Sequence, residues 1–173
     1  MWLVGVSGLY ENVGNTAGTS VELSKALMRD TIRQLVPIHA TRFDWDDPRL
    51  RGSCLRDWAR YRTLRESTEA WFEYWQDCIG GMRLRPSPLT VRLLEWRRAN
   101  IPDSDEPPSL VHSDYGLHNI LVEDDKVSAV LDWEYLTFGD PAADLALLSR
   151  TLSGQMSKQE ILTTYVEYGG RPI

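Results

Sequence analysis

The sequence is poor in the residues that mark metal scaffolds, secreted folds and membrane spans. It has two cysteines, Cys54 and Cys78, and three histidines among 173 residues. No C-x-x-C spacing is present, which disfavours a structural zinc site or a disulfide framework and indicates free thiols in a reducing, cytoplasmic compartment. No apolar run approaches the roughly 20 residues of a membrane span, and no basic segment followed by a long apolar one opens the chain. We therefore expect no membrane association and no signal peptide.

Most of the chain also has no excess of charge of either sign. Residues 1–110 hold 15 acids and 15 bases, whereas residues 111–173 hold 10 acids and 4 bases, which accounts for the net charge of −6. A nucleic-acid-binding protein needs a basic face, so we expect no nucleic-acid partner. The acidic final segment is either a solvated surface or the surroundings of a metal or cationic ligand.

The composition that remains is ordinary for a globular domain, with 42% hydrophobic and 25% charged residues. The T-x-x-E pattern of Thr19–Glu22 predicts a helix that begins near Ser20, and Pro37 is expected to kink or end it. Residues 54–79 and 88–99 predict two further helices, followed by a turn-rich linker over 100–108. The aromatic and arginine-rich stretch 58–75 is either core plus a solvated face or the wall of a substrate pocket.

The pattern changes to short strands after residue 109. Residues 110–112, 120–122 and 127–131 are mostly apolar and predict short strands, and a polar turn between the last two predicts a hairpin. Gly139-Asp140-Pro141 then opens a helix, with Asp140 at the N-cap and Pro141 at the first helical position. A last helix is predicted over about 157–168.

One stretch carries chemistry: His112-Ser-Asp114-Tyr-Gly-Leu-His-Asn119, followed by Leu-Asp132-Trp-Glu after the hairpin. An acid after one strand, an amide five residues later and a second acid after a hairpin strand form the layout of a phosphoryl-transfer site. Magnesium prefers hard oxygen ligands, which carboxylate and amide groups supply. Each residue alone could be a turn or cap residue; the three spacings together favour the site.

The pattern HSDYGLHNILV…LDWE…GDPAADLA resembles the aminoglycoside phosphotransferase and choline kinase group of small-molecule phosphotransferases. The resemblance implies an α+β fold, the protein-kinase-like C-terminal lobe, mostly helical with a small β-hairpin at the catalytic site. It implies that Asp114 is the catalytic Asp and that Asn119 and Asp132 hold Mg2+ on the phosphates of ATP or GTP. Ser113 stands where the family more often has Gly, a departure that does not touch these residues.

The neighbouring polar residues have supporting or open roles. His112 is expected to brace the backbone rather than move protons, and Asp140 to act as a cap. Asp144 either joins a supporting hydrogen-bond network or is an exposed acid, and Glu134 faces either the site or solvent. His118 is expected to be a loop residue and His39 a packing residue.

A kinase-like enzyme also needs a lobe that holds the nucleotide with a Gly-rich hairpin and a strand lysine. The chain has three lysines, Lys25, Lys126 and Lys158, and we expect none within an apolar strand. We therefore interpret residues 1–20 as a hinge remnant and loop, 21–109 as the helical part of a C-terminal lobe, and 110–173 as the catalytic part. The N-terminal nucleotide lobe is expected to be absent, and to be supplied in cis or in trans.

The resulting hypothesis is an ATP-dependent phosphotransferase lobe that acts on a hydroxyl of a small molecule, weakly active or inactive as this chain alone. The chain would be a fragment of a longer gene product, a truncated expression product, or a single-lobe protein that acts with a partner chain. The alternative from another class is a non-catalytic, kinase-derived binding module or an inactive gene fragment.

Overall fold

The computed structural model describes residues 22–44, 46–48, 60–81 and 86–173. In chain order the elements are α2 (Lys25–Ala40), α3 (Leu64–Gly81), α4 (Pro88–Ala99), β1 (Ser109–Val111), η3 (Leu117–Asn119), β2 (Ile120–Glu123), β3 (Lys126–Val130), η4 (Trp133–Tyr135), β4 (Thr137–Gly139), α5 (Ala142–Thr151) and α6 (Lys158–Glu167). Contacts divide the chain into two compact units. Of the described residues, the first unit holds 22–42, 110–137 and 141–173, and the second holds 43–109 and 138–140.

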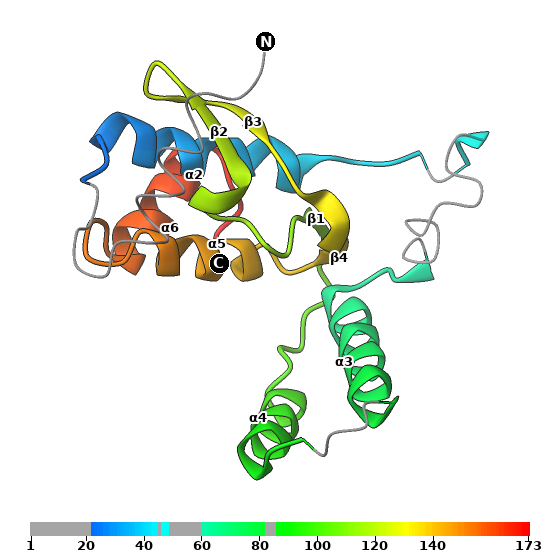
Figure 1. Cartoon of the computed structure of the whole chain (residues 1–173). Helices are drawn as coiled ribbons and strands as arrows, with labels where there is room; N and C mark the ends of the chain where they lie inside the picture. Colours follow the sequence, from blue (N-terminus) through cyan, green and yellow to red (C-terminus); the bar gives the residue numbers. More distant parts are fainter. Residues whose placement is uncertain (1–21, 45, 49–59, 82–85) are drawn as a thin grey trace. The chain divides into compact units, whose positions relative to one another are not determined.

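The first unit is a helical layer that carries a hairpin. Helix α2 packs against β3 on one side and α6 on another, and α6 packs against α5 (Figure 1). Leucine, isoleucine and aromatic side chains from the three helices form one core, against which the valines of β3 pack; Ile32, Leu35 and Leu148 are fully buried in it. Burial of such side chains contributes roughly 1.5–3 kcal/mol each. This core fixes the hairpin and the loop before it on one framework of helices.

Helix α2 begins later than the sequence predicts. It starts at Lys25, where the Ser24 hydroxyl accepts the Leu27 N–H at 3.0 Å. The predicted start near Ser20 is wrong, because residues 22–24 are not helical; Ser20 itself and the proposed hinge segment lie outside the described residues. Ser24 lies three residues before Leu27, which is the first buried residue of the helix. The cap therefore places the start of the helix just before its buried face begins.

Pro37 does not end α2, contrary to one of the two outcomes expected. The helix continues to Ala40, and its last turn places His39 in the buried interior, with both ring nitrogens hydrogen bonded. Proline removes one backbone hydrogen bond. The tertiary contacts of His39 offset that loss.

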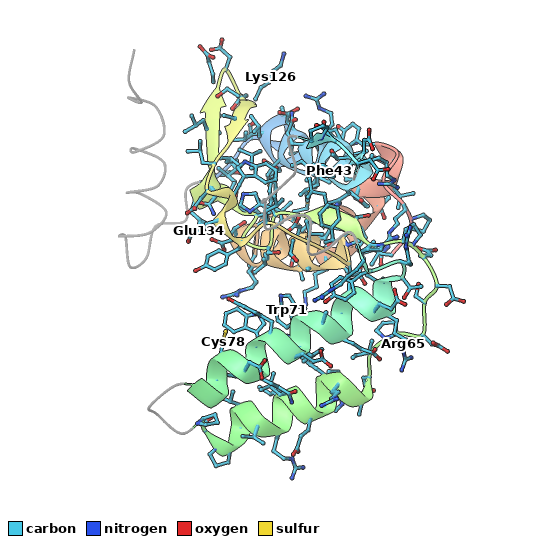
Figure 2. The ribbon with its side chains drawn as sticks, turned by 90° about the vertical axis from the view of Figure 1, so that its right-hand side faces the viewer. Phe43, Arg65, Trp71, Cys78, Lys126 and Glu134 are labelled. Carbon is cyan, nitrogen blue, oxygen red and sulfur yellow. The ribbon has the colours of Figure 1, made fainter. Side chains whose placement is uncertain are left out.

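The second unit contains α3 and α4, which pack on each other. Helix α3 begins at Leu64, and residues 61–63 before it are not helical, so the predicted helix is not continuous up to this point; residues 54–59 lie outside the described residues. The Arg97 guanidinium lies over the rings of Trp71 and Phe72 at 5.1 and 5.3 Å, which joins the two helices. Figure 2 labels Trp71 among the α3 side chains. Helix α4 has the predicted bounds and buries no residue.

The last segments confirm the predicted hairpin and correct one cap. Strands β2 and β3 pair antiparallel, joined by a two-residue turn in which Asp124 and Asp125 have φ of 49° and 57°, typical of a type I′ turn. Helix α5 begins one residue later than predicted, so Pro141 and not Asp140 occupies its N-cap. Proline has no side-chain oxygen, and its fixed φ accounts for its place at this terminus. No helix in the described ranges is both long and apolar enough to cross a membrane.

A buried carboxylate ties the hairpin to α2. Asp30 accepts the Val127 N–H at 2.8 Å and the Arg33 Nε–H at 2.7 Å. The ladder between β2 and β3 shifts register between Leu121 and Val122, beside Val127. Burial raises the pKa of Asp30, but the hydrogen bonds from Val127, Arg33 and Gln34 outweigh it and leave this pKa below its ordinary value of 3.8.

We predict that Asp30→Ala lowers the free energy of unfolding by about 1–3 kcal/mol, because the partly buried Val127 N–H loses its acceptor. The folded-state pKa of Asp30 is lowered, so its stabilisation is present above pH 3.8 and is lost as pH falls through the folded value. Asp30→Asn keeps an acceptor for Val127 and should flatten this acid-side loss. Urea unfolding as a function of pH measures both effects; an unchanged pH dependence in Asp30→Asn would contradict them.

Candidate active site

The loop after β1 places Asp114 with one carboxylate oxygen paired. Asp114 Oδ2 accepts the Asn119 Nδ2–H at 3.0 Å and lies 3.2 Å from His118 Nε2. Oδ1 has no hydrogen-bond partner among the described residues, and the side chain is 39% exposed. One oxygen is therefore held while the other is available to accept a proton from a hydroxyl group.

The amide of Asn119 is oriented by the same contact. Its Nδ2 donates to both the backbone oxygen of Asp114, at 2.9 Å, and Asp114 Oδ2. Both partners are acceptors, which assigns nitrogen and oxygen within the amide. Oδ1 has no partner in the described part of the chain and is not completely buried, although the residue as a whole is only 6% exposed. Asn119 thus presents a hard oxygen, as a magnesium ligand requires.

Main-chain hydrogen bonds bring the segment that carries Asp132 to this loop. The Leu131 N–H donates to the backbone oxygen of Asn119 at 2.8 Å, and the backbone oxygen of Leu131 accepts from His112 Nε2 at 2.7 Å. Asp132, the next residue, has left-handed backbone angles, φ 61° and ψ 61°. Its carboxylate is exposed and has no hydrogen-bond or ion-pair partner among the described residues. That Asn119 and Asp132 share one ion stays a prediction.

The left-handed conformation at Asp132 is fixed by the residue that follows. The ring of Trp133 lies 4.7 Å from that of His112, and its indole Nε1–H donates to the Val130 oxygen at 3.0 Å. Non-glycine residues in this region are strained by roughly 1–3 kcal/mol and persist where their neighbours determine them. Glu134, one residue further in η4 (Figure 2), is exposed.

His112 braces the backbone at two points. It is fully buried; Nδ1 accepts the Asp114 N–H at 3.3 Å, and Nε2 donates to the Leu131 oxygen. Both ring nitrogens are occupied, so neither is available for transferring a proton. This geometry agrees with a supporting role. Asp140 is half-buried and belongs to the second unit, so its supporting role stays a prediction.

Asp144 organises the loop, and the sequence had left its role open. Its carboxylate is fully buried: Oδ1 accepts the Ser113 N–H at 2.8 Å, and Oδ2 accepts the His112 N–H at 2.8 Å and the His39 Nε2–H at 3.1 Å. His39 Nδ1 in turn accepts the Tyr165 hydroxyl at 2.8 Å. Asp144 is thus a network residue and not an exposed acid, and His39 is more than a packing residue. In the sequence, the spacing of Asp144 from Leu148 (four residues) and Leu152 (eight residues) could have indicated that it lies on the buried face of the helix.

Tyr115 anchors the same loop from its other side. The ring is fully buried, and its hydroxyl donates to the backbone oxygen of Thr31 in α2 at 2.8 Å. Burial, with added repulsion from Asp144 and Asp30, raises the pKa of this phenol. The hydroxyl therefore remains a donor, and the loop between β1 and η3 is held from both ends.

No three His, Cys, Asp or Glu side chains in the described ranges cluster closely enough to hold a metal by themselves. An ion at Asn119 and Asp132 would take its other ligands from nucleotide phosphates and water, as magnesium commonly does. The donor set therefore fits a nucleotide-borne ion and not a resident one.

The helical layer, the hairpin and the His112–Asn119 loop define the fold of a kinase-like phosphotransferase lobe. Residues 6–171 match the sequence model of the phosphotransferase enzyme family, and the chain belongs to that family. The fold is similar to the crystal structure of macrolide 2′-phosphotransferase MphH from Brachybacterium faecium, with a TM-score of 0.62 and 23% identity, over 91% of this chain and 51% of that one.

Two curated relatives match shorter segments. Acyl-CoA dehydrogenase family member 11 of Rattus norvegicus is 48% identical over 64 residues, which are 36% of this chain and 8% of that protein. Hygromycin-B 4-O-kinase of Escherichia coli is 39% identical over 44 residues, which are 25% of this chain and 13% of that protein. The chain thus corresponds to about half of the solved structure and to small segments of these relatives.

We predict that Asp144→Ala lowers the free energy of unfolding by about 3 kcal/mol or more, because it leaves two backbone N–H groups and the His39 ring without their buried acceptor. Glu123→Ala is the matched control, an exposed acid on β2 in the same unit, expected to change it by less than about 0.5 kcal/mol. Urea denaturation followed by circular dichroism measures both variants. Equal losses would contradict the assigned role of Asp144.

Proposed function

We propose that the chain carries the catalytic and metal-binding half of an ATP- or GTP-dependent phosphotransferase that acts on a hydroxyl of a small molecule. One observation carries the proposal: the Asn119 Nδ2 group is committed to Asp114, which leaves Asn119 Oδ1 and Asp114 Oδ1 both available. The hydrogen bonds of Leu131 bring the Asp132 segment to the same loop. Family membership supports the class of reaction.

The chain's residues divide the chemistry as follows. Magnesium, when bound, would neutralise charge on the nucleotide phosphates. Asn119 Oδ1 and the Asp132 carboxylate would hold it. Asp114 Oδ1 orients the acceptor hydroxyl and receives its proton, while the hydroxyl oxygen bonds the γ-phosphorus and the bond from that phosphorus to the β–γ bridging oxygen breaks. The nucleoside diphosphate leaves with that electron pair.

The nucleotide needs further contacts beyond this half. Of the three lysines, Lys25 and Lys158 lie at the starts of α2 and α6, and Lys126 is the exposed first residue of β3 (Figure 2). None lies inside a buried strand, as expected from the sequence. We propose that a Gly-rich hairpin and a strand lysine come from a nucleotide lobe, in cis or in trans.

The acceptor is proposed as a class: a hydroxyl compound such as an aminoglycoside, another antibiotic, an amino alcohol or a metabolite. The names of the relatives specify a macrolide, hygromycin B and acyl-CoA. An acceptor panel should therefore include a macrolide, hygromycin B and a hydroxylated acyl-CoA. The 10 acids and 4 bases of residues 111–173 favour cationic acceptors.

The free thiol of Cys78 supports a reducing, cytoplasmic setting.

The second candidate is a non-catalytic binding module or an inactive fragment, favoured by the lack of a buried strand lysine. It predicts no magnesium-dependent effect of nucleotide on the chain. Thermal unfolding with ATP or GTP, with and without magnesium, separates the two candidates: the phosphotransferase proposal predicts a rise in melting temperature that requires the ion.

We predict that Asp114→Asn and Asp132→Asn have different effects. With the nucleotide lobe present, Asp114→Asn should reduce kcat about 10²–10⁴-fold, because the proton acceptor is lost, with little change in nucleotide affinity. Asp132→Asn removes a metal-binding charge, so it should weaken magnesium–nucleotide binding and be partly rescued by high magnesium. Calorimetric titration and steady-state rates measure both. If magnesium rescues both variants alike, Asp114 is a metal ligand and not the base.

We also predict little or no turnover from residues 1–173 alone. Phosphoryl transfer depends mainly on positioning and on charge stabilisation, and a strand lysine and Gly-rich loop normally supply part of each. A radiolabelled-ATP assay over the acceptor panel measures this directly. Robust phosphorylation of any panel member by the purified chain would refute the prediction.

A further inference from the structure

We propose that His118 is a positioning residue for Asp114, and that Gly116 provides the space this contact requires. The inference rests on the proposed function, because it concerns the carboxylate that receives the acceptor's proton. It assigns roles to two residues of the loop for which the sequence suggested none.

His118 and Asn119 hold the same oxygen atom. The Nε2 atom of His118 lies 3.2 Å from Asp114 Oδ2, and Asn119 Nδ2 lies 3.0 Å from it. A carboxylate oxygen accepts, so His118 Nε2 carries the hydrogen in this contact. The two donors come from adjacent residues of η3 and restrict rotation of the carboxyl group about the Cβ–Cγ bond. The other carboxylate oxygen, Oδ1, is thereby kept pointing in one direction. The side chains of Asp114 and His118 are 39% and 37% exposed to solvent.

Gly116 explains why the ring can reach this position. A Cβ atom at residue 116 would lie 2.8 Å from His118 Cε1 and 2.9 Å from His118 Nδ1, distances that real Cβ contacts do not show. The backbone there is extended, with φ −174° and ψ 176°, which any residue adopts. The glycine is therefore required for space and not for an unusual conformation. A third neighbour, Thr151 Cγ2 in α5, would lie 3.0 Å away.

The contact matters for rate and not for binding. Asp114 must aim one oxygen at the acceptor hydroxyl, and a misplacement of about 1 Å can cost up to roughly 10²-fold in rate. Loss of the His118 donor leaves Asn119 as the sole side chain on Oδ2. We expect kcat to fall about 10-fold or more while KM for the nucleotide and the acceptor stays nearly unchanged.

The test is a double-mutant cycle in the full chain together with its nucleotide lobe. His118→Ala and Gly116→Ala should each lower kcat by a similar factor. Together they should lower it no further than either alone, because both remove one contact. His118→Gln, which restores an N–H donor, should recover part of the rate. Nitrogen-15 spectra of the imidazole at about pH 8.5, where an ordinary histidine is neutral, should show hydrogen on Nε2 in the unsubstituted chain and lose this preference in Gly116→Ala and Asp114→Ala.

Four outcomes would overturn the inference. Transfer by the unsubstituted protein with kcat changed less than twofold in His118→Ala overturns the positioning role and leaves the proposed function intact. Multiplicative losses in the double variant, or no Nε2–H preference, also overturn it. Absence of transfer by the unsubstituted protein with any acceptor, together with no magnesium-dependent nucleotide binding, refutes the proposed function and the inference with it.

Discussion

The buried carboxylate of Asp144 is the interaction on which the rest of the site depends. It accepts two consecutive backbone N–H groups, from His112 and Ser113, and one imidazole N–H. An unpaired charge in this fully buried position would be strongly destabilising, and three donors offset that cost. The two backbone bonds also account for Ser113, whose φ of 68° is unfavourable for a non-glycine residue. The loop that follows is therefore held in a single conformation, which directs Asp114 toward Asn119.

Helix α2 provides the frame against which the parts are aligned. Asp30 binds the hairpin at Val127, the adjacent Thr31 oxygen accepts the hydroxyl of Tyr115, and His39 reaches Asp144 from the last turn. Each contact fixes one of the three segments that carry or orient the proposed catalytic groups. A change in the position of α2 would move all of them together, which links helix packing to the geometry of the site.

Most of the candidate site could be predicted from the sequence, because spacing within a loop and a hairpin is local. The hairpin and α4 required only turn residues and periodicity, and the spacing of Asp114 and Asn119 indicated that both lie in one loop. The start of α2, the continuation past Pro37 and the role of His39 could not be predicted in this way, since each depends on tertiary contacts between residues far apart in the chain. Asp144 shows the same limit: burial on the face of α5 that carries Leu148 decided between its two possible roles.

The central claim is that Asn119 Oδ1 and Asp132 hold one nucleotide-borne ion. Replacing magnesium with manganese in the presence of ATP, and recording paramagnetic broadening of assigned amide and indole signals, tests it directly. We expect the signals of the Asn119 side-chain amide and the Trp133 indole to broaden first, and Asp132→Asn to abolish this broadening. Selective broadening at the exposed acidic turn around Asp124 and Asp125, with the Asn119 amide unaffected, would contradict the account.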